Sequence, residues 1–159
     1  MVIWLTGISG AGKSTICKTI WSKAKARTPE LVSLDGDVVR DVFDTKFGYT
    51  EPERSKQIRR IQSLAKMLTD QGLKVLVAAL YSHPDLLAWN RKNLPGYFEV
   101  YVDAPLWLVR QRDPKGLYAR ADRGEMPNVV GIDVPWHPTL TPDLDRKSTR
   151  LNSSHTDIS

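Results

Sequence analysis

Residues 7–14 read Gly-Ile-Ser-Gly-Ala-Gly-Lys-Ser, the stretch that decides the fold. Its glycine spacing and its Lys-Ser ending match a phosphate-binding loop, in which backbone N–H groups turn inward around phosphate oxygens. The apolar run at residues 2–5 predicts a strand before the loop, and apolar residues at helical spacing predict an amphipathic helix over 13–25 after it. Strand, loop and helix in this order place a helix N-terminus against bound phosphates, so a mere glycine turn is the weaker interpretation.

Beyond this unit the chain alternates strand-like apolar runs with helical patterns. The further strands are predicted at 31–34, 75–80 and 98–102, and the further helices at 50–71, 85–93 and 104–112. The longest helix begins at a capping box, Thr50 with Glu53 three residues later, and ends before Gly72. Alternation of this kind produces a parallel sheet with helices on both faces. We therefore expect an α/β protein with the three-layer fold of the P-loop NTPases.

The regular patterns fail after Asp113. From there to Pro142 the chain holds five prolines and three glycines, and a long irregular segment in a compact enzyme is often a lid. We predict a mostly irregular path with a lid near residues 113–135, and a domain that covers residues 1–145. Residues 146–159, RKSTRLNSSHTDIS, contain two apolar residues and no period. A flexible natural tail is the ordinary interpretation of this segment, and its resemblance to translated adapter sequence makes a non-native tail the alternative, so we place it outside the domain.

The overall composition is that of one soluble globular domain. The chain has 159 residues, is 41% hydrophobic and carries a formal charge of +5. The longest apolar run, residues 75–81, is far shorter than the roughly 20 residues of a membrane span, and no leader pattern is visible. The basic residues are scattered, which argues against a nucleic-acid partner and agrees with anionic substrates. We expect a cytoplasmic protein whose single cysteine, Cys17, is a buried helix residue.

Residues around the loop carry the predicted chemistry. In a phosphate-binding loop Lys13 reaches the β and γ phosphates of ATP, and the Ser14 hydroxyl binds Mg2+. Asp35 and Asp37 follow the next strand, at the sheet edge where open α/β folds bind ligands, so one of them can serve the Mg2+ or the attacking hydroxyl. A solvated Asp-Gly turn is the alternative for this pair.

Arginines follow the aspartate pair. Arg40 and Arg54 lie near the turn and the start of the long helix, and their guanidinium groups suit bidentate binding of phosphate or sulfate. Gln57 shares a helix face with Arg54. For Arg59 and Arg60 a solvated helix surface is the favoured interpretation.

The motifs together resemble one family. GISGAGKST at residues 7–15, LDGDVVR at 34–40, FGYTEPERSKQIRR at 47–60, FEVYVDAPLWLVRQRDPKGLY at 98–118 and GID at 131–133 are similar to the adenylyl-sulfate kinases. The resemblance covers residues 1 to about 144 and implies transfer of the ATP γ-phosphate to the ribose 3′-hydroxyl of adenylyl sulfate. It also implies that a last strand and a helix, which the family has after the position of Leu144, are missing here.

The resemblance also implies roles for individual residues. Asp37 and Arg40 would face the acceptor nucleotide, Arg54 would bind its phosphosulfate, and Tyr49 would stack on its base. Lys115 in the lid would cover the phosphates. The implied ATP-binding residues are Gly7, Ile8, Ser9, Gly10, Ala11, Gly12, Lys13, Ser14, Thr15 and, against the adenine, Arg112.

Ser82 matches a serine that some members of the family phosphorylate. A hydrogen-bonding role at a strand end is the favoured interpretation of this residue.

Departures from the family pattern bear on the acceptor. Tyr49 stands where the family usually has Phe, Gln57 and Val38 each replace an Asn, and Val129 replaces a second base-stacking Phe. An aliphatic side chain loses aromatic stacking, so a related kinase acting on another nucleotide-linked anion, such as cytidine diphosphoramidate, is an alternative. A nucleotide-binding module without turnover and an RNA-associated P-loop protein are others. The sequence does not decide between a monomer and a homodimer.

Overall fold

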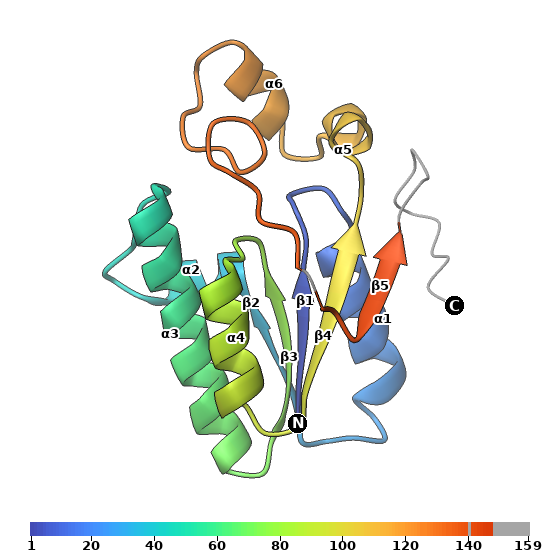
Figure 1. Ribbon diagram of the computed structural model, residues 1–159. Helices are drawn as coiled ribbons and strands as arrows, with labels where there is room; N and C mark the ends of the chain where they lie inside the picture. Colours follow the sequence, from blue (N-terminus) through green and yellow to red (C-terminus); the bar gives the residue numbers. More distant parts are fainter. Residues whose placement is uncertain (140, 148–159) are drawn as a thin grey trace.

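The computed structural model describes residues 1–139 and 141–147 (Figure 1). One parallel sheet forms its centre, with the strand order β2-β3-β1-β4-β5. The strands are β1 (Val2–Thr6), β2 (Leu31–Asp35), β3 (Lys74–Ala79), β4 (Tyr97–Asp103) and β5 (Leu144–Lys147). The predicted parallel α/β fold is confirmed.

Helices cover both faces of the sheet (Figure 1). They are α1 (Lys13–Ala24), α2 (Gly36–Val42), α3 (Glu51–Asp70), α4 (Pro84–Asn93), α5 (Leu106–Arg112) and α6 (Leu117–Asp122). The long helix α3 packs beside α4 on one face, and α1 lies on the other (Figure 1). All strands point the same way, so their carboxyl ends meet at one edge, where the segment after residue 6, α5 and α6 gather. This edge is where parallel α/β sheets bind ligands.

The central strands carry the core. Trp4 and Leu5 of β1 and Leu76 and Val77 of β3 are fully buried, because helices cover both faces of these strands. Near-continuous apolar runs of this kind are typical of parallel sheets. Cys17 on α1 is buried, as predicted, and burial raises the pKa of its thiol to about 12, so it is inert at neutral pH.

The sequence interpretation was wrong at the edge strand. It predicted no strand after Leu144 and ended the domain at 145, yet Leu144–Lys147 pairs with residues 100–103 of β4. The boundary at 145 therefore cuts through β5. Only one of its four residues is apolar, and its strand form depends on pairing with β4, so no local pattern reveals it. The prediction that the family's last helix is missing concerns positions after β5, and residues 148–159 lie outside the described residues.

Two short helices were also missed. Helix α2 begins because the Asp35 side chain accepts a hydrogen bond from the Asp37 N–H at 2.9 Å, an N-cap role that the sequence interpretation did not include. Helix α6 interrupts the segment predicted to be mostly irregular.

The start of α3 is placed correctly at Thr50, but the capping box is not formed. The Thr50 hydroxyl lies 3.2 Å from the Glu53 carboxylate instead of bonding to the helix backbone. No helix in the described part of the chain has the length and hydropathy of a membrane span.

Candidate active site

The phosphate-binding loop connects β1 to α1 at the carboxyl edge of the sheet. A turn closes it, with the Ala11 N–H donating to the Ile8 carbonyl at 3.1 Å. Gly7 must lack a side chain, because a Cβ there would lie 2.6 Å from the Val102 carbonyl oxygen. The loop is thus set tightly against β4, and its open side faces a cleft.

Lys13 is folded over its own loop. Its Nζ donates to the carbonyls of Gly7 at 2.5 Å and Ile8 at 3.0 Å. Burial, with a smaller contribution from the positive charge of Lys115, lowers the pKa of Lys13 to about 8. A partly desolvated ammonium group held beside the loop amides is suited to receive phosphate oxygens.

Ser14 and Asp35 bring oxygen donors together beside Lys13. The Ser14 Oγ lies 3.3 Å from Asp35 Oδ2, which joins the first turn of α1 to the end of β2. Hydroxyl and carboxylate oxygens are the protein ligands that Mg2+ uses when substrate phosphates and water fill its other positions. No cluster of three or more His, Cys, Asp or Glu side chains that could cage a metal exists in the described residues. The residues present therefore fit a Mg2+ shared with a nucleotide.

Asp37 and Lys115 form an ion pair across the mouth of the cleft. Lys115 Nζ lies 2.6 Å from Asp37 Oδ2, and both side chains are largely exposed. The pair joins the lid (residues 113–135) to the start of α2, 78 positions earlier in the chain. Exposed pairs of this kind contribute little to stability, so an incoming anion can separate them readily.

Arg54 and Tyr49 form a platform on the other side of the cleft. Arg54 is 8% exposed; its Nε donates to the Tyr49 carbonyl at 2.9 Å and its NH2 to the Asn128 carbonyl at 2.7 Å. The Arg40 guanidinium lies 4.5 Å from the centre of the Tyr49 ring. Burial and the neighbouring charge of Arg40 lower the pKa of Arg54. Two guanidinium groups beside one ring make a positively charged surface suited to an aromatic anion.

Both sides open into one cleft of about 470 Å³. It brings together the predicted residues Ser9, Gly10, Gly12, Lys13, Ser14, Thr15, Asp35, Asp37, Arg40, Tyr49, Arg54, Gln57 and Lys115. This volume is in the usual range for a small-molecule site.

Comparison with known proteins decides the family. The family model for adenylylsulphate kinase matches residues 1–147. An adenylyl-sulfate kinase from Deinococcus deserti is 39% identical over 95% of this chain and 83% of its own length, and one from Gloeothece citriformis is 41% identical over 91% and 82%. An APS kinase of Mycobacterium tuberculosis, solved in complex with AMPPNP and APS, superposes with a TM-score of 0.85 at 35% identity over 94% of this chain and 88% of its own.

The chain belongs to the adenylylsulfate kinase family. The structure of this adenylylsulfate kinase locates the positions that the sequence analysis set apart from the family pattern. Val129, at which the resemblance implies the loss of an aromatic residue, lines the cleft and is buried. Gln57 donates to the Gly36 carbonyl at 3.3 Å, while its Oε1 has no hydrogen-bond partner among the described residues. Val38 is exposed on α2.

Ser82 and Arg112 lie apart from the cleft lining. Ser82 is 1% exposed, and its hydroxyl donates to the His137 carbonyl at 2.7 Å. This contact matches the hydrogen-bonding interpretation of Ser82. Arg112 donates to the Gly10 carbonyl at 3.2 Å, so it contacts the phosphate loop, and its place against the adenine stays a prediction.

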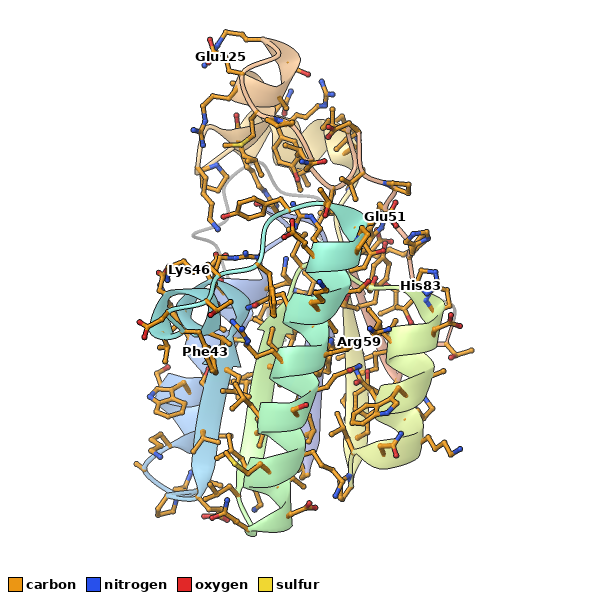
Figure 2. All side chains as sticks on the ribbon, turned by 90° about the vertical axis from the view of Figure 1, so that its left-hand side faces the viewer. Phe43, Lys46, Glu51, Arg59, His83 and Glu125 are labelled. Atoms are coloured by element: carbon orange, nitrogen blue, oxygen red, sulfur yellow. The ribbon has the colours of Figure 1, made fainter. Side chains whose placement is uncertain are left out.

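The loop before the platform, residues 43–47, is held by Arg60, for which a solvated surface was the favoured interpretation, and by Lys46. Arg60 lies 4.1 Å from the Phe43 ring and 4.2 Å from the Phe47 ring and donates to the Thr45 carbonyl at 3.0 Å. Lys46 donates to three carbonyls at the end of α2. Figure 2 shows Phe43 and Lys46 on the α2 side of the molecule, and Arg59 on α3. Arg60 is thus partly exposed and also held by these contacts, whereas Arg59 is exposed as expected.

Asn128 and Asp133 support Arg54 through contacts that sequence reasoning missed. Both Asp133 oxygens accept backbone N–H groups, from Asn128 and Val129, at 2.6 Å each. These bonds lower the pKa of Asp133 and hold the Asn128 carbonyl where Arg54 can reach it. Asp133 belongs to the quoted GID motif, and this motif was the one feature of the sequence that pointed to a role for it.

Proposed function

We propose that this kinase transfers the γ-phosphoryl group of ATP to the ribose 3′-hydroxyl of adenylyl sulfate. One observation carries the proposal: the phosphate loop and the Arg54–Tyr49 platform open into the same cleft of about 470 Å³. A donor phosphate and an acceptor nucleotide can therefore meet in one cleft. Catalysis would depend mainly on positioning and on neutralising charge.

The donor side would hold ATP. The loop N–H groups and the N-terminus of α1 would bind its phosphates, and Lys13 would exchange its bonds to Gly7 and Ile8 for phosphate oxygens. Ser14 and Asp35 would hold Mg2+, which supplies further neutralisation of phosphate charge. Because Asp35 is bonded to Ser14, it belongs to the metal side of the aspartate pair.

The acceptor side would hold adenylyl sulfate. Tyr49, which is half exposed, offers a ring face to the base. Arg54 and Arg40 would bind the phosphosulfate, and the carbonyls of Tyr49 and Asn128 fix the orientation of the Arg54 guanidinium beforehand.

Asp37 would act as the general base. Acceptor binding would draw Lys115 from Asp37 toward the phosphates and leave the carboxylate free to take the 3′-hydroxyl proton. The hydroxyl oxygen then bonds to the γ-phosphorus, the bond from that phosphorus to the bridging oxygen breaks, and ADP leaves. Lys115 thereby serves first as a latch and then as a phosphate ligand.

A second acceptor is favoured by one observation. Buried Val129 gives the cleft an aliphatic wall where the family places an aromatic ring, so selection for adenine is weaker on that side. Cytidine diphosphoramidate has the same ribose hydroxyl and an anionic diphosphate. A cytoplasmic location stays a prediction of the sequence, and the choice between a monomer and a homodimer stays open.

Measurement of ADP release from the full chain tests the proposal. MgATP is offered with adenylyl sulfate, with cytidine diphosphoramidate or with no acceptor. We expect adenylyl sulfate to raise the rate at least about a hundredfold over the rate without acceptor. If only cytidine diphosphoramidate stimulated ADP release, the second acceptor would be supported and adenylyl sulfate contradicted. ATP binding without stimulation by either would contradict the kinase function and leave a nucleotide-binding module.

A further inference from the structure

Tyr118 connects the base of the lid to the phosphate loop. Its side chain is 1% exposed and belongs to the hydrophobic core, whereas Ser9 and Gly10 line the cleft. The Tyr118 hydroxyl donates a 2.6 Å hydrogen bond to the Ser9 carbonyl, 109 positions earlier in the chain. A buried tyrosine bonded to a loop backbone is a rigid support, because its ring is packed and its hydroxyl has one fixed partner.

The same segment packs against the next residue of the loop. Gly10 has a φ of +84°, which favours glycine, and a Cβ there would lie 3.4 Å from Val109 Cβ and 3.7 Å from Pro114 Cδ. Arg112 donates to the Gly10 carbonyl at 3.2 Å. The tip of the phosphate loop therefore rests on residues 109–118 through packing and through two side-chain hydrogen bonds.

Asp113 holds Tyr118 in place. It ends α5 with a φ of +25°, a conformation that Asp adopts more readily than most residues, and its two carboxylate oxygens accept the N–H groups of Tyr118 and Ala119 at 3.0 Å. Burial raises the pKa of Tyr118 to about 12, so its hydroxyl keeps the donated proton at neutral pH.

The Ser9–Gly10 peptide connects this support to the ligand. None of the peptide bonds in the described residues is cis, and in a trans peptide the C=O and the N–H point in opposite directions. We propose that Tyr118 is a positioning residue for nucleotide phosphate: by holding the Ser9 carbonyl toward the core, it aims the Gly10 N–H into the cleft. The inference rests on the proposed function in one respect: it assumes that the loop binds a nucleotide phosphate.

This arrangement would supply affinity by pre-organisation. An untethered peptide can rotate, and binding must then restore one orientation at a cost in free energy. The tether removes that cost before ATP arrives. It acts on nucleotide binding and leaves the acceptor platform and the chemical step unchanged.

Replacing Tyr118 by Phe tests the proposal, because the ring remains and only the hydroxyl is lost. The matched control is Tyr97→Phe, which removes a hydroxyl bonded to Glu99 at 2.7 Å, away from the loop. ATP dissociation constants are measured calorimetrically without acceptor, together with KM for ATP, KM for acceptor and kcat. We expect Tyr118→Phe to weaken ATP binding about fivefold to tenfold, the value of one hydrogen bond, and Tyr97→Phe less than about twofold.

The outcomes separate a positioning role from a structural one. A rise in KM for ATP with unchanged kcat and acceptor KM supports the tether; a change below twofold, or equal weakening in both variants, overturns it. If Tyr118→Phe does not fold, Asp113→Asn, which loosens the support of Tyr118, takes its place, and unchanged ATP affinity there overturns the tether. The proposed function fails separately, when the unmodified chain binds ATP but shows no acceptor-dependent ADP release.

Discussion

The donor and acceptor sides of the cleft are built in different ways. On the donor side, Lys13 bonds to carbonyls five and six residues before it, within one continuous motif. On the acceptor side, Arg54 bonds to the Asn128 carbonyl 74 residues away, and the peptide of that carbonyl is held in turn because its Val129 N–H donates to Asp133. Under the proposed function, phosphate binding is therefore encoded locally in this chain, whereas acceptor binding depends on folding of the lid against α3.

Loss of the Lys13 charge should have the largest effect. Lys13→Met removes the cation that would meet the phosphate charge as it develops, so we expect kcat to fall about 100-fold to 1,000-fold. Acceptor-dependent ADP release measures it. Lys18→Met, on the exposed side of the same helix, is the control and should change kcat less than about twofold. A Lys13 variant with near-normal kcat would remove this residue from the proposed chemistry.

Arg54→Lys tests whether acceptor binding can be weakened without weakening ATP binding. The substitution keeps the charge but loses the planar group that bonds to Tyr49 and Asn128 together, so acceptor KM should rise about tenfold to 100-fold. Steady-state kinetics should show KM for ATP changed by less than about twofold. Arg59→Lys, an exposed neighbour on α3, serves as the control. Equal losses for both substrates would show that the two sides are not independent.

The pH dependence of ATP binding tests whether Lys13 binds phosphate on the donor side. Because the pKa of Lys13 is lowered to about 8, raising the pH through 8 removes its positive charge from the ligand-free protein. ATP must then restore the proton on binding, so affinity should decline by up to about tenfold per pH unit above 8 and stay nearly constant just below it. Calorimetry over this range measures the decline. Lys13→Arg, which stays protonated, should give a flatter profile, and a flat profile in the unmodified chain would contradict the assignment.

Ser82 should matter least for catalysis. It lies outside both sides of the cleft, and Ser82→Ala removes only its bond to the His137 carbonyl. We expect the free energy of unfolding to fall by about 1 kcal/mol. Acceptor-dependent turnover should change less than about threefold. Denaturant unfolding and ADP release measure the two effects, with exposed Ser63→Ala as the control. A large loss of turnover without loss of stability would contradict this expectation and indicate that Ser82 takes part in the reaction.

Sequence reasoning succeeded where the signal is local and periodic. The apolar runs predicted the four long strands, and the spacing of Ile58, Ile61 and Ala65 predicted α3, because each pattern reflects burial of one face. It failed for β5, which is held by its neighbour, and it did not show the contacts of Arg60 with two phenylalanine rings. The partner of such a residue is distant in the chain, and no single-sequence pattern names it.

By itself, the sequence determined the parallel α/β fold and the phosphate loop, since glycine spacing, a Lys-Ser pair and apolar periodicity act over a few residues. Only the tertiary structure decided that Lys115 reaches Asp37, that Asn128 orients Arg54 and that Tyr118 supports Ser9. Each of these contacts joins positions at least 70 residues apart, and it exists because the parallel sheet brings the ends of separate strands to one edge.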